Sequence, residues 1–522
     1  MKLKDIKSLI PAAYMMLAVG ATSCINELDI SPINPQQNTV FVQDQVFTKI
    51  YATLGLTGQE GPAGVGDVAG IDEGTSAFYR LILVANENPT DMVHCCWGDP
   101  GIPEFNNIAW GSSDNKIEGL YGRLNFDVVL CNHFLEKTAG LTDANTVKQR
   151  AEVRFIRALN LYYLMDLYAN VPFSETVSEK LPLQIKRPEL FAFIEKELKE
   201  IDADLYAPMQ APFGRADQSA AWLLLSRMYL NAQVYTGTAR WADAAAYADK
   251  VIKQSGRSLC NNYAHLFMAD NDENINARNE FILPIRQDGI YTRSYGGSLY
   301  AIAATHTNGM NSWGTSEGWG GIRARKALVD KFFNKIPVPM DADETGMVAA
   351  ANDDRALFFA GGDRKLEINN VNSFKEGLSI TKWSNARSDG KTPKDPKWTD
   401  TDIPFFRLAE AYLTFAEATL RSGGSQQAAL DAVNQLRTRA HASTFATINL
   451  NMILDEKARE FYFEGQRRTD LVRYDYFTTN KYVWDWKGGE KAGTSVRNIY
   501  NIYPIPANDL NANKNLTQNP GY

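Results

Sequence analysis

Two pairs of Ala-rich segments, far apart in the chain, place the strongest constraint on its fold. The pairs cover residues 216–235 with 238–254, and 405–424 with 425–440. In these segments small Ala positions alternate with Leu and Tyr at helical spacing. Such helix pairs bury their apolar faces only by stacking on neighbouring pairs, as tetratricopeptide repeats do. The sequence therefore predicts a mainly α fold in which tetratricopeptide-like helix pairs form a scaffold.

Other parts of the chain also carry helical signals. Helices are predicted at 150–173, where Asn170-Val171-Pro172 ends the pattern, and at 456–474. Either Asp217 or Ser219 can cap the first Ala-rich helix, because both side chains accept hydrogen bonds from N–H groups of a first turn.

The two Ala-rich pairs are separated by about 150 residues of different character. Within them, 296–321 has no helical period and is rich in Gly, Asn and Ser, and residues 55–115 are similar. Long loops in compact domains are usually functional. We therefore expect a large loop-rich insertion, held by the helical scaffold, to carry the binding site.

The first residues of the chain are typical of an export signal. Lys2, Lys4 and Lys7 precede an apolar stretch at 9–20, which is too short to cross a bilayer that needs about 20 apolar residues. Ala21-Thr22-Ser23-Cys24 resembles a lipobox, the pattern at which a lipoprotein signal peptide is cut and its cysteine acylated. An ordinary signal peptide with a coincidental cysteine is the alternative.

These signals predict the organisation of the chain. We expect a lipoprotein signal peptide at 1–23, a spacer at 24–38 anchored through lipid on Cys24, and a single domain at 39–522. No later apolar run is long enough to cross a membrane. The domain is therefore expected to be held at a membrane surface by its anchor.

Composition excludes some classes of function. The formal net charge is −7, whereas a protein that binds nucleic acid needs a basic surface to displace counterions from phosphates. We therefore expect no nucleic acid partner. Apart from Cys24, the cysteines are Cys95, Cys96, Cys131 and Cys260, and their spacing fits neither a disulfide scaffold nor a zinc site.

The chain lacks a convincing catalytic motif. GTSEG at 314–318 matches a nucleophile elbow, but no buried strand precedes it. The five His lack HExxH spacing, and neither a P-loop nor a Rossmann fingerprint occurs. DADETG at 341–346 begins like a calcium loop, yet Asn352 occupies the position of the bidentate Glu. Carboxylates are abundant without any pair being singled out, so a surface glycosidase stays an alternative.

Aromatic residues give the clearest chemical signal. Trp97, Tyr295, Trp313 and Trp319 lie beside Gly, Asn, Asp or Ser in segments predicted to be loops. Sugars stack their apolar C–H faces on such rings, while Arg, amides and carboxylates bind their hydroxyl groups. The rings therefore indicate a carbohydrate ligand, and packing in the core is the alternative for each of them.

Blocks of sequence in a fixed order support this interpretation. They include ENPTD (87–91), QRAEVRFIRALN (149–160), LPIRQDG (283–289), YGGSLY (295–300), DTDIPFFRLAEAYLT (400–414) and AREFYFEGQRRTDLVRY (458–474). Through these blocks the chain resembles, almost end to end, the SusD/RagB family of outer-membrane, glycan-binding lipoproteins. The resemblance implies a helical fold built on tetratricopeptide-like pairs and no catalytic activity. It also implies a TonB-dependent transporter as partner, over which the lipoprotein sits as a lid that faces the cell surface.

The resemblance further implies a set of glycan-binding residues. Tyr295 and Trp319 stand where two stacking rings of the family lie, and Trp97 takes the place of a third. Arg80 stands where an arginine contacts hydroxyl groups, and Asp67 completes the implied set.

Some residues depart from the family's pattern. Cys95 stands where a neighbouring Trp is expected, and Pro100 falls near the position of an Asn. The expected ligand is therefore an α-glucan that need not have the tight curvature of starch: starch itself, a malto-oligosaccharide or a dextran-like chain with α-1,6 linkages.

Two acidic clusters, DNDEN (270–274) and TDTD (399–402), gather oxygen donors in turn-like segments. From these, Asp272, Asn274 and Asp402 fall at positions that resemble the family's calcium site. A structural Ca²⁺ is therefore expected there, and solvated loop acids are the alternative. No cofactor for catalysis is expected.

The leading hypothesis is a non-catalytic surface lipoprotein of the outer membrane that captures α-glucan chains and passes them to a transporter. The alternative from a different class is a structural lid of the transporter with little glycan affinity of its own.

Overall fold

The computed structural model describes residues 40–522, except residues 63 and 335. The predicted signal peptide, its anchor Cys24 and the spacer lie outside the described residues. The chain divides into two units, Met1–Val46 and Phe47–Tyr522, and the fold reported below is that of the second unit. Among the described helices, none combines the length and the apolar character needed to span a bilayer.

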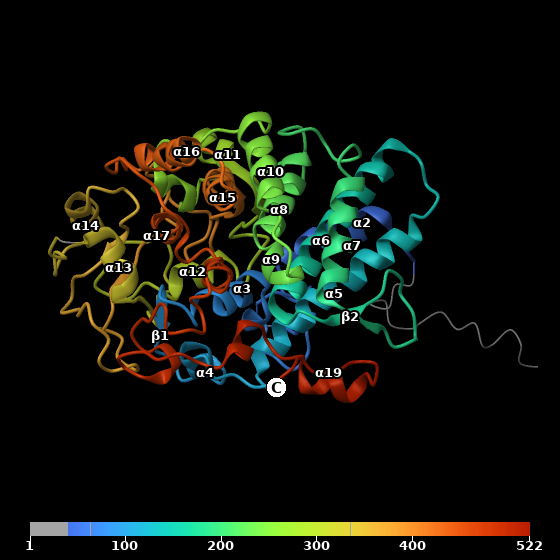
Figure 1. Ribbon diagram of the computed structural model, residues 1–522, viewed down its shortest axis with the longest axis horizontal. Helices are drawn as coiled ribbons and strands as arrows, with labels where there is room; N and C mark the ends of the chain where they lie inside the picture. The colour runs from blue at the N-terminus through green and yellow to red at the C-terminus, as the bar shows by residue number, and fades with distance from the viewer. Residues whose placement is uncertain (1–39, 63, 335) are drawn as a thin grey trace, which may run out of the picture. The chain divides into compact units, whose positions relative to one another are not determined.

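Helices make up most of the regular structure (Figure 1). The α-helices are α2 (Gln43–Gly55), α3 (Phe78–Glu87), α4 (Ile102–Asn107), α5 (Asn115–Lys137), α6 (Ala144–Tyr168), α7 (Arg187–Glu200), α8 (Gln218–Leu230), α9 (Ala232–Thr236), α10 (Trp241–Gln254), α11 (Ile275–Glu280), α12 (Ser298–Ala303), α13 (Lys326–Phe333), α14 (Glu344–Ala351), α15 (Leu408–Arg421), α16 (Gln426–Arg439), α17 (Leu450–Phe461), α18 (Arg467–Arg473) and α19 (Ala507–Ala512). Short 3-10 helices are η1 (Gly74–Ser76), η2 (Tyr263–Phe267), η3 (Lys487–Gly489) and η4 (Asn498–Asn501).

The longer helices stack one upon the next. α5 packs on α6, α6 on α7, α7 on α8, α8 on α10, α10 on α15, and α15 on both α16 and α17, from the right to the centre-left of Figure 1. The stack passes from α10 directly to α15, although residues 255–407 separate these helices in the chain. Fully buried Ala residues on α10 and α15, such as Ala244 and Ala409, suit this close packing. The predicted scaffold of helix pairs with a large insertion is therefore confirmed.

Side-chain caps set the start of several helices. Asp217 is the N-cap of α8, because its carboxylate accepts hydrogen bonds from the backbone N–H groups of Ser219 and Ala220. Asp143 caps α6 in the same way, through the N–H of Thr146. α6 therefore begins earlier than predicted.

The helix predicted over 456–474 is interrupted. α17 ends at Phe461 and α18 begins at Arg467. Between them, Phe463 and Gly465 adopt φ angles of 57° and 84°, and the N–H of Gly465 donates a 2.7 Å hydrogen bond to buried Glu87. The prediction of one continuous helix is wrong because this tertiary contact outweighs the local helical signal.

The two segments predicted to be loops each contain a helix. α12 lies within 296–321 and α3 within 55–115, and nearly all of their residues are buried. α12 is only six residues long and buried throughout, so it is too short to show a helical period. α3 does have a helical period, with Arg80 and Glu87 seven residues apart on one face, so the sequence contained its signal. The prediction that these segments lack helices is wrong on this point.

The strands pair only in two-stranded antiparallel sheets within the part of the chain that the structure describes. The pairs are β1 (Val93–Cys95) with β5 (Ile322–Ala324), β2 (Val171–Phe173) with β3 (Leu183–Ile185), β4 (Phe281–Ile285) with β8 (Ile403–Arg407), and β6 (Phe358–Phe359) with β7 (Ser379–Ile380). All of them except β2–β3 tie the insertion to itself or to the scaffold. They therefore decide which loops of the insertion meet.

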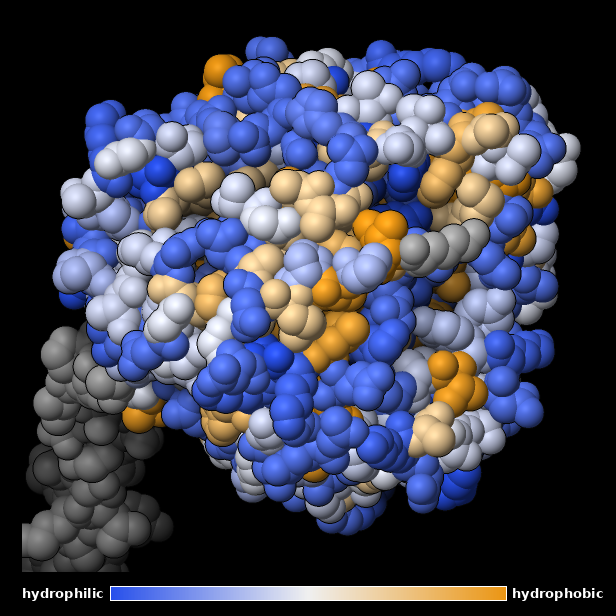
Figure 2. Space-filling model, turned by 90° about the vertical axis from the view of Figure 1, so that its left-hand side faces the viewer, coloured by the Kyte–Doolittle hydropathy of each residue, from blue (hydrophilic) through white to orange (hydrophobic). Residues whose placement is uncertain are grey.

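Surface hydrophobic residues are scattered. The face in Figure 2, seen from the side of α13 and α14, carries hydrophobic residues in small groups among hydrophilic ones. Exposed apolar side chains of the insertion include Ile336, Met340 and Phe374. Single exposed apolar residues are ordinary on soluble proteins, so a binding site has to be recognised by how its residues are arranged.

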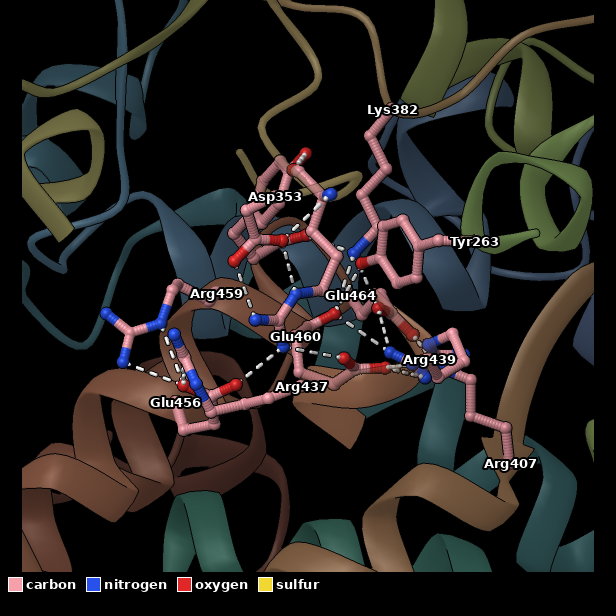
Figure 3. Close-up of polar contacts among 12 residues, drawn as sticks. Tyr263, Asp353, Lys382, Arg407, Arg437, Arg439, Glu456, Arg459, Glu460 and Glu464 are labelled. Atoms are coloured by element: carbon pink, nitrogen blue, oxygen red, sulfur yellow. Dashed lines mark hydrogen bonds and ion pairs between the residues drawn. The ribbon is translucent and has the colours of Figure 1, made fainter. Parts of the chain in front are cut away.

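A network of buried ion pairs surrounds Glu460 of α17 (Figure 3). Glu460 pairs with Arg407 at 2.5 Å, with Arg355 at 3.1 Å and with Arg439. Further pairs of the network are Arg407–Glu464, Arg407–Glu280, Arg439–Glu280, Lys382–Glu464, Arg355–Glu456, Arg437–Glu456 and Arg459–Glu456. The network joins β8, α16 and α17 to the end of α11 and to the segment after β7. We call it the Glu460 network.

Replacing Glu460 by Gln should lower the free energy of unfolding by about 3–5 kcal/mol, because three buried arginines lose their shared charged partner. Urea denaturation followed by circular dichroism measures this change. Glu490→Gln alters an exposed glutamate and should change the value by less than about 0.5 kcal/mol. Equal effects of the two substitutions would contradict a central role for Glu460.

Candidate functional site

The β1–β5 ladder brings two of the predicted ring positions together. Cys95 at the end of β1 lies opposite Ile322 at the start of β5. Since the strands are antiparallel, the residues just after β1 and just before β5 leave the ladder at the same end. Trp97 and Trp319 are therefore neighbours.

The β4–β8 ladder does the same for two other loops. Ile285 at the end of β4 pairs with Ile403 at the start of β8. The loop after β4 carries Tyr295, and the loop before β8 carries Trp398. These two loops therefore also leave their ladder side by side.

Four rings from these loops form one row. The ring centroids are 6.5 Å apart for Trp97 and Trp319, 6.2 Å for Trp319 and Tyr295, and 5.0 Å for Tyr295 and Trp398. All four side chains are half-buried, so each keeps part of its surface open to solvent. We call this arrangement the ring row. It brings together Trp97, Tyr295 and Trp319, which were predicted from the sequence.

A polar clamp holds the edges of the central rings. The indole N–H of Trp319 donates to Glu317 at 2.8 Å, and the ammonium group of Lys397 donates to the Tyr295 hydroxyl at 2.9 Å. Lys397 also pairs with Glu317 at 3.4 Å and lies 4.9 Å from the ring centroid of Trp398. The hydrogen bond to Tyr295 raises the pKa of Lys397, which stays a cation. The Lys397 ammonium group also lies 4.9 Å from the ring centroid of Tyr295, so the clamp holds the rings through cation–π contacts as well as through hydrogen bonds.

The Trp97 end of the row is backed by an arginine. The Trp97 ring lies 6.3 Å from that of buried Tyr300, and the guanidinium carbon of Arg80 lies 4.6 Å from the centre of the Tyr300 ring. Arg80 is half-buried, and no ion pair joins it to another described residue. Its N–H groups can therefore serve a ligand. Cys95 is buried in β1, and burial raises the pKa of its thiol to about 12.

Two further candidates from the sequence, Asp67 and Trp313, do not belong to the ring row and contact other parts of the protein. The carboxylate of Asp67 pairs with Lys49 at 2.7 Å and with Arg123 at 3.3 Å, and no contact among the described residues joins it to the ring row. Its role in binding stays a prediction. Trp313 packs its ring 5.1 Å from that of buried His306. Trp313 therefore supports the loop that presents Trp319.

Two of the predicted calcium ligands, Asp272 and Asp402, lie around one arginine. Asp402 is buried, and burial raises the pKa of its carboxyl to about 8. Its Oδ2 atom has no hydrogen bond, although Arg286 Nε lies 3.1 Å away; Arg286 also reaches Asp272 at 3.3 Å. The Asn274 amide oxygen instead accepts the N–H of Asn276 as the cap of α11.

The fit to a cation is therefore partial. Asp272 and Asp402 can share a cation in place of the Arg286 side chain, whereas the amide oxygen of Asn274 is already engaged. Among the described residues, no group of three or more His, Cys, Asp and Glu is placed to hold a metal. A cation here would need backbone carbonyl groups or water to complete its shell.

Sequence reasoning did not include Trp398, Lys397 and Glu317. Trp398 lies in DPKWTD, a segment without helical period and with Asp, Pro and Lys around the ring. Its immediate neighbours are Lys397 and Thr399, so the criterion of a ring beside Gly, Asn, Asp or Ser passes over it, whereas the lack of helical period around it is a signal that could have found it. Lys397 and Glu317 carry no such signal, because they meet only where the loop before β5 touches the loop before β8, through hydrogen bonds from Ser316 and Thr315 to the backbone of Pro396 and Lys397.

The ring row is partly open to solvent, since all four of its side chains are half-buried. Cavities with volumes of about 350 Å³ and 540 Å³ lie elsewhere, the first around Phe213 and Arg257, the second between α5, the β2–β3 hairpin and α19. Rings that are partly open to solvent can contact a long ligand along its side, without having to enclose one of its ends.

A scaffold of stacked helix pairs that holds such a row in its loops defines a helical binding protein, and comparison with known proteins gives the family. The sequence model of the SusD family matches residues 346–522. Over the full length of both chains, the protein is 50% identical to the starch-binding protein SusD of Bacteroides thetaiotaomicron. The protein belongs to the SusD family. This membership confirms the prediction that it is not an enzyme.

Solved structures share the fold. A SusD-like carbohydrate-binding protein of Bacteroides fragilis superimposes with a TM-score of 0.70, at 19% identity over 91% of this chain and 98% of the other. Surface glycan-binding protein A of Bacteroides thetaiotaomicron, solved in complex with laminarihexaose, superimposes with a TM-score of 0.67, at 18% identity over 91% and 98%. These similarities confirm the predicted fold class.

Gly321 leaves the space that Trp97 occupies, since a Cβ atom on Gly321 would lie 2.0 Å from the indole. Gly321→Ala should therefore displace Trp97 and cost about 1–3 kcal/mol of stability. Thermal denaturation and a crystal structure of the variant measure these effects. The control is Gly98→Ala, at the residue that follows Trp97 in the chain. A Cβ atom on Gly98 meets no atom within 4 Å, so this variant should keep the stability of the wild type and the position of Trp97. An undisturbed Trp97 in the first variant would contradict this packing.

Proposed function

We propose that the protein is a non-catalytic, cell-surface lipoprotein that captures α-glucan chains and delivers them to a TonB-dependent transporter of the outer membrane. The ring row is the observation that carries the proposal, because it brings four half-buried aromatic rings side by side, each partly open to solvent. The full-length similarity to a starch-binding protein supports α-glucan as the ligand class. Starch, malto-oligosaccharides and dextran-like chains are the candidate ligands.

The row and its clamp suit reversible binding of a polymer. Each ring contributes about 1 kcal/mol through contact with a sugar face, while Arg80 and Lys397 offer N–H groups to hydroxyl oxygens. The affinity for a short chain is then modest, so bound chain can be released. A polymer gains avidity because it meets several molecules held at the same surface.

Delivery requires the protein to stay near its transporter. The lipobox-like sequence that ends at Cys24 supports a lipid anchor, and an acyl chain holds a folded domain at a membrane surface without crossing it. In this proposal the anchor places the ring row above the transporter, and weak stacking lets the glucan pass on.

Substituting Trp319 by Ala should abolish retention of the protein in affinity gels that contain glucan, because the row loses a central ring and the clamp loses a partner. Tyr295→Ala should have the same effect. The matched control is Trp241→Ala, which removes a half-buried indole from α10 and should leave retention unchanged. Retention of both row variants at the wild-type level would refute the site.

Calorimetry with starch, dextran and a non-glucan polymer then tests the ligand class. Heat with one or both glucans and none with the control polymer is the expected result. A protein that releases no heat with any polymer would act as a lid of the transporter alone. New reducing ends after incubation would reveal a glycosidase.

We also propose that Asp272 and Asp402 hold a structural Ca²⁺. The buried Asp402 oxygen that lacks a hydrogen bond supports this, as does the 47% exposure of the Arg286 side chain, which can leave the two carboxylates. The ion would tie the loop before α11 to the start of β8.

Adding Ca²⁺ to chelator-treated protein should raise the melting temperature by several degrees, because an ion that binds only the folded state stabilises it. Asp402→Asn should remove this response, whereas Asp363→Asn, at a carboxylate that is 93% exposed, should retain it. Melting temperatures that are identical with and without Ca²⁺ would contradict the proposal.

A further inference from the structure

A fifth aromatic side chain stands close to the end of the ring row. Tyr291 is 82% exposed, the highest value among the exposed large hydrophobic residues in the described part of the chain. Within the described residues no ring contact involves it, so neither the core nor the ring row accounts for its position. It lies in the loop that follows β4 and that also carries Tyr295.

The backbone that carries Tyr291 is firmly held. Asp288 accepts the N–H of Tyr291 at 3.2 Å through one carboxylate oxygen and pairs with Lys394 at 2.7 Å through the other. The N–H of Gly289 donates to Asp400 at 2.9 Å. Both partners belong to the segment that contains Trp398, so the two loops form one rigid unit.

The same unit keeps the backbone of Tyr291 close to Trp398, the last ring of the row. A Cβ atom on Gly289 would lie 2.8 Å from the carbonyl oxygen of Trp398, so the backbones of the two loops touch at this point. Tyr291 follows Gly289 by two residues, which limits the distance between their Cα atoms to about 7 Å. Tyr291 therefore lies in the neighbourhood of Trp398, the ring at one end of the row.

We propose that Tyr291 is an outer platform of the glycan site, on which sugar units beyond those over the ring row stack. The inference rests on the proposed function and extends it, because it assigns a residue that selects for longer α-glucan chains. Stacking on Tyr291 costs little entropy: its backbone is already fixed, and only the side chain has to be ordered. A short chain that covers the row alone does not reach it.

Isothermal titration with a short and a long malto-oligosaccharide, maltotriose and maltoheptaose, tests this role. Tyr291→Ala should weaken binding of the long chain about fivefold, the contribution of one ring contact, and leave binding of the short chain unchanged. Tyr291→Phe keeps the ring and should bind both chains like the wild type. Leu183→Ala, at an exposed residue of β3, is the control for loss of an exposed apolar side chain.

The outcomes separate this inference from the function on which it rests. If the wild type binds both chains and Tyr291→Ala binds each of them as tightly as the wild type does, the outer platform is refuted, while α-glucan binding stands. Contact with another protein would then be the remaining role for Tyr291. Equal weakening of both chains would also refute it, because the ring would then belong to the row itself. A wild type that binds neither chain would overturn the proposed function together with the platform.

Discussion

The Glu460 network is the constraint on which the rest of the structure depends. Its members are removed from water, and burying a charge is costly unless partners surround it. Burial alone would raise the pKa of Glu460, but Arg439, Arg407 and Arg355 outweigh it and hold the pKa well below its ordinary range. Lys382 shows the opposite balance, since burial lowers its pKa to about 8 despite the attraction of Glu464. A network of this kind tolerates only one arrangement of the segments that supply it.

That arrangement extends to the ring row through two short paths. Arg407 ends β8, so the network fixes the strand that begins just after Trp398. The second path starts at Lys382, which is followed three residues later by Asn385. The backbone N–H of Asn385 donates to the carbonyl oxygen of Trp313. Its side-chain oxygen accepts the N–H of Asp400. The loops before Trp319 and after Trp398 are thus tied to the same segment. The rings keep their spacing because charged groups in the interior determine the positions of their loops.

The sequence predicts the scaffold better than the site, for physical reasons. The Ala-rich pairs are revealed by their helical period, whereas the six residues of α12 are too few and too completely buried to show one. Trp97, Tyr295 and Trp319 were indicated by loop composition and by the family resemblance, but their mutual distances follow from strand pairings that no local pattern encodes. The block that contains Glu460 was visible as a family signature. From the sequence alone, the charged residues of this block resemble the solvent-exposed face of a helix. The folded structure shows that these charged side chains are buried.

The partly open form of the row has a consequence for the kind of ligand it can serve. A cavity selects a molecule of fixed size, because its walls must be matched on all sides. A row of rings that are each partly open to solvent contacts the side of a chain, so a polymer can lie across it at many positions along its own length. Each contact is weak, and the clamp of Glu317 and Lys397 keeps the rings ordered before the ligand arrives, which lowers the entropy lost on binding. In the proposed function this combination allows a chain to be caught anywhere along its length and released without a large conformational change.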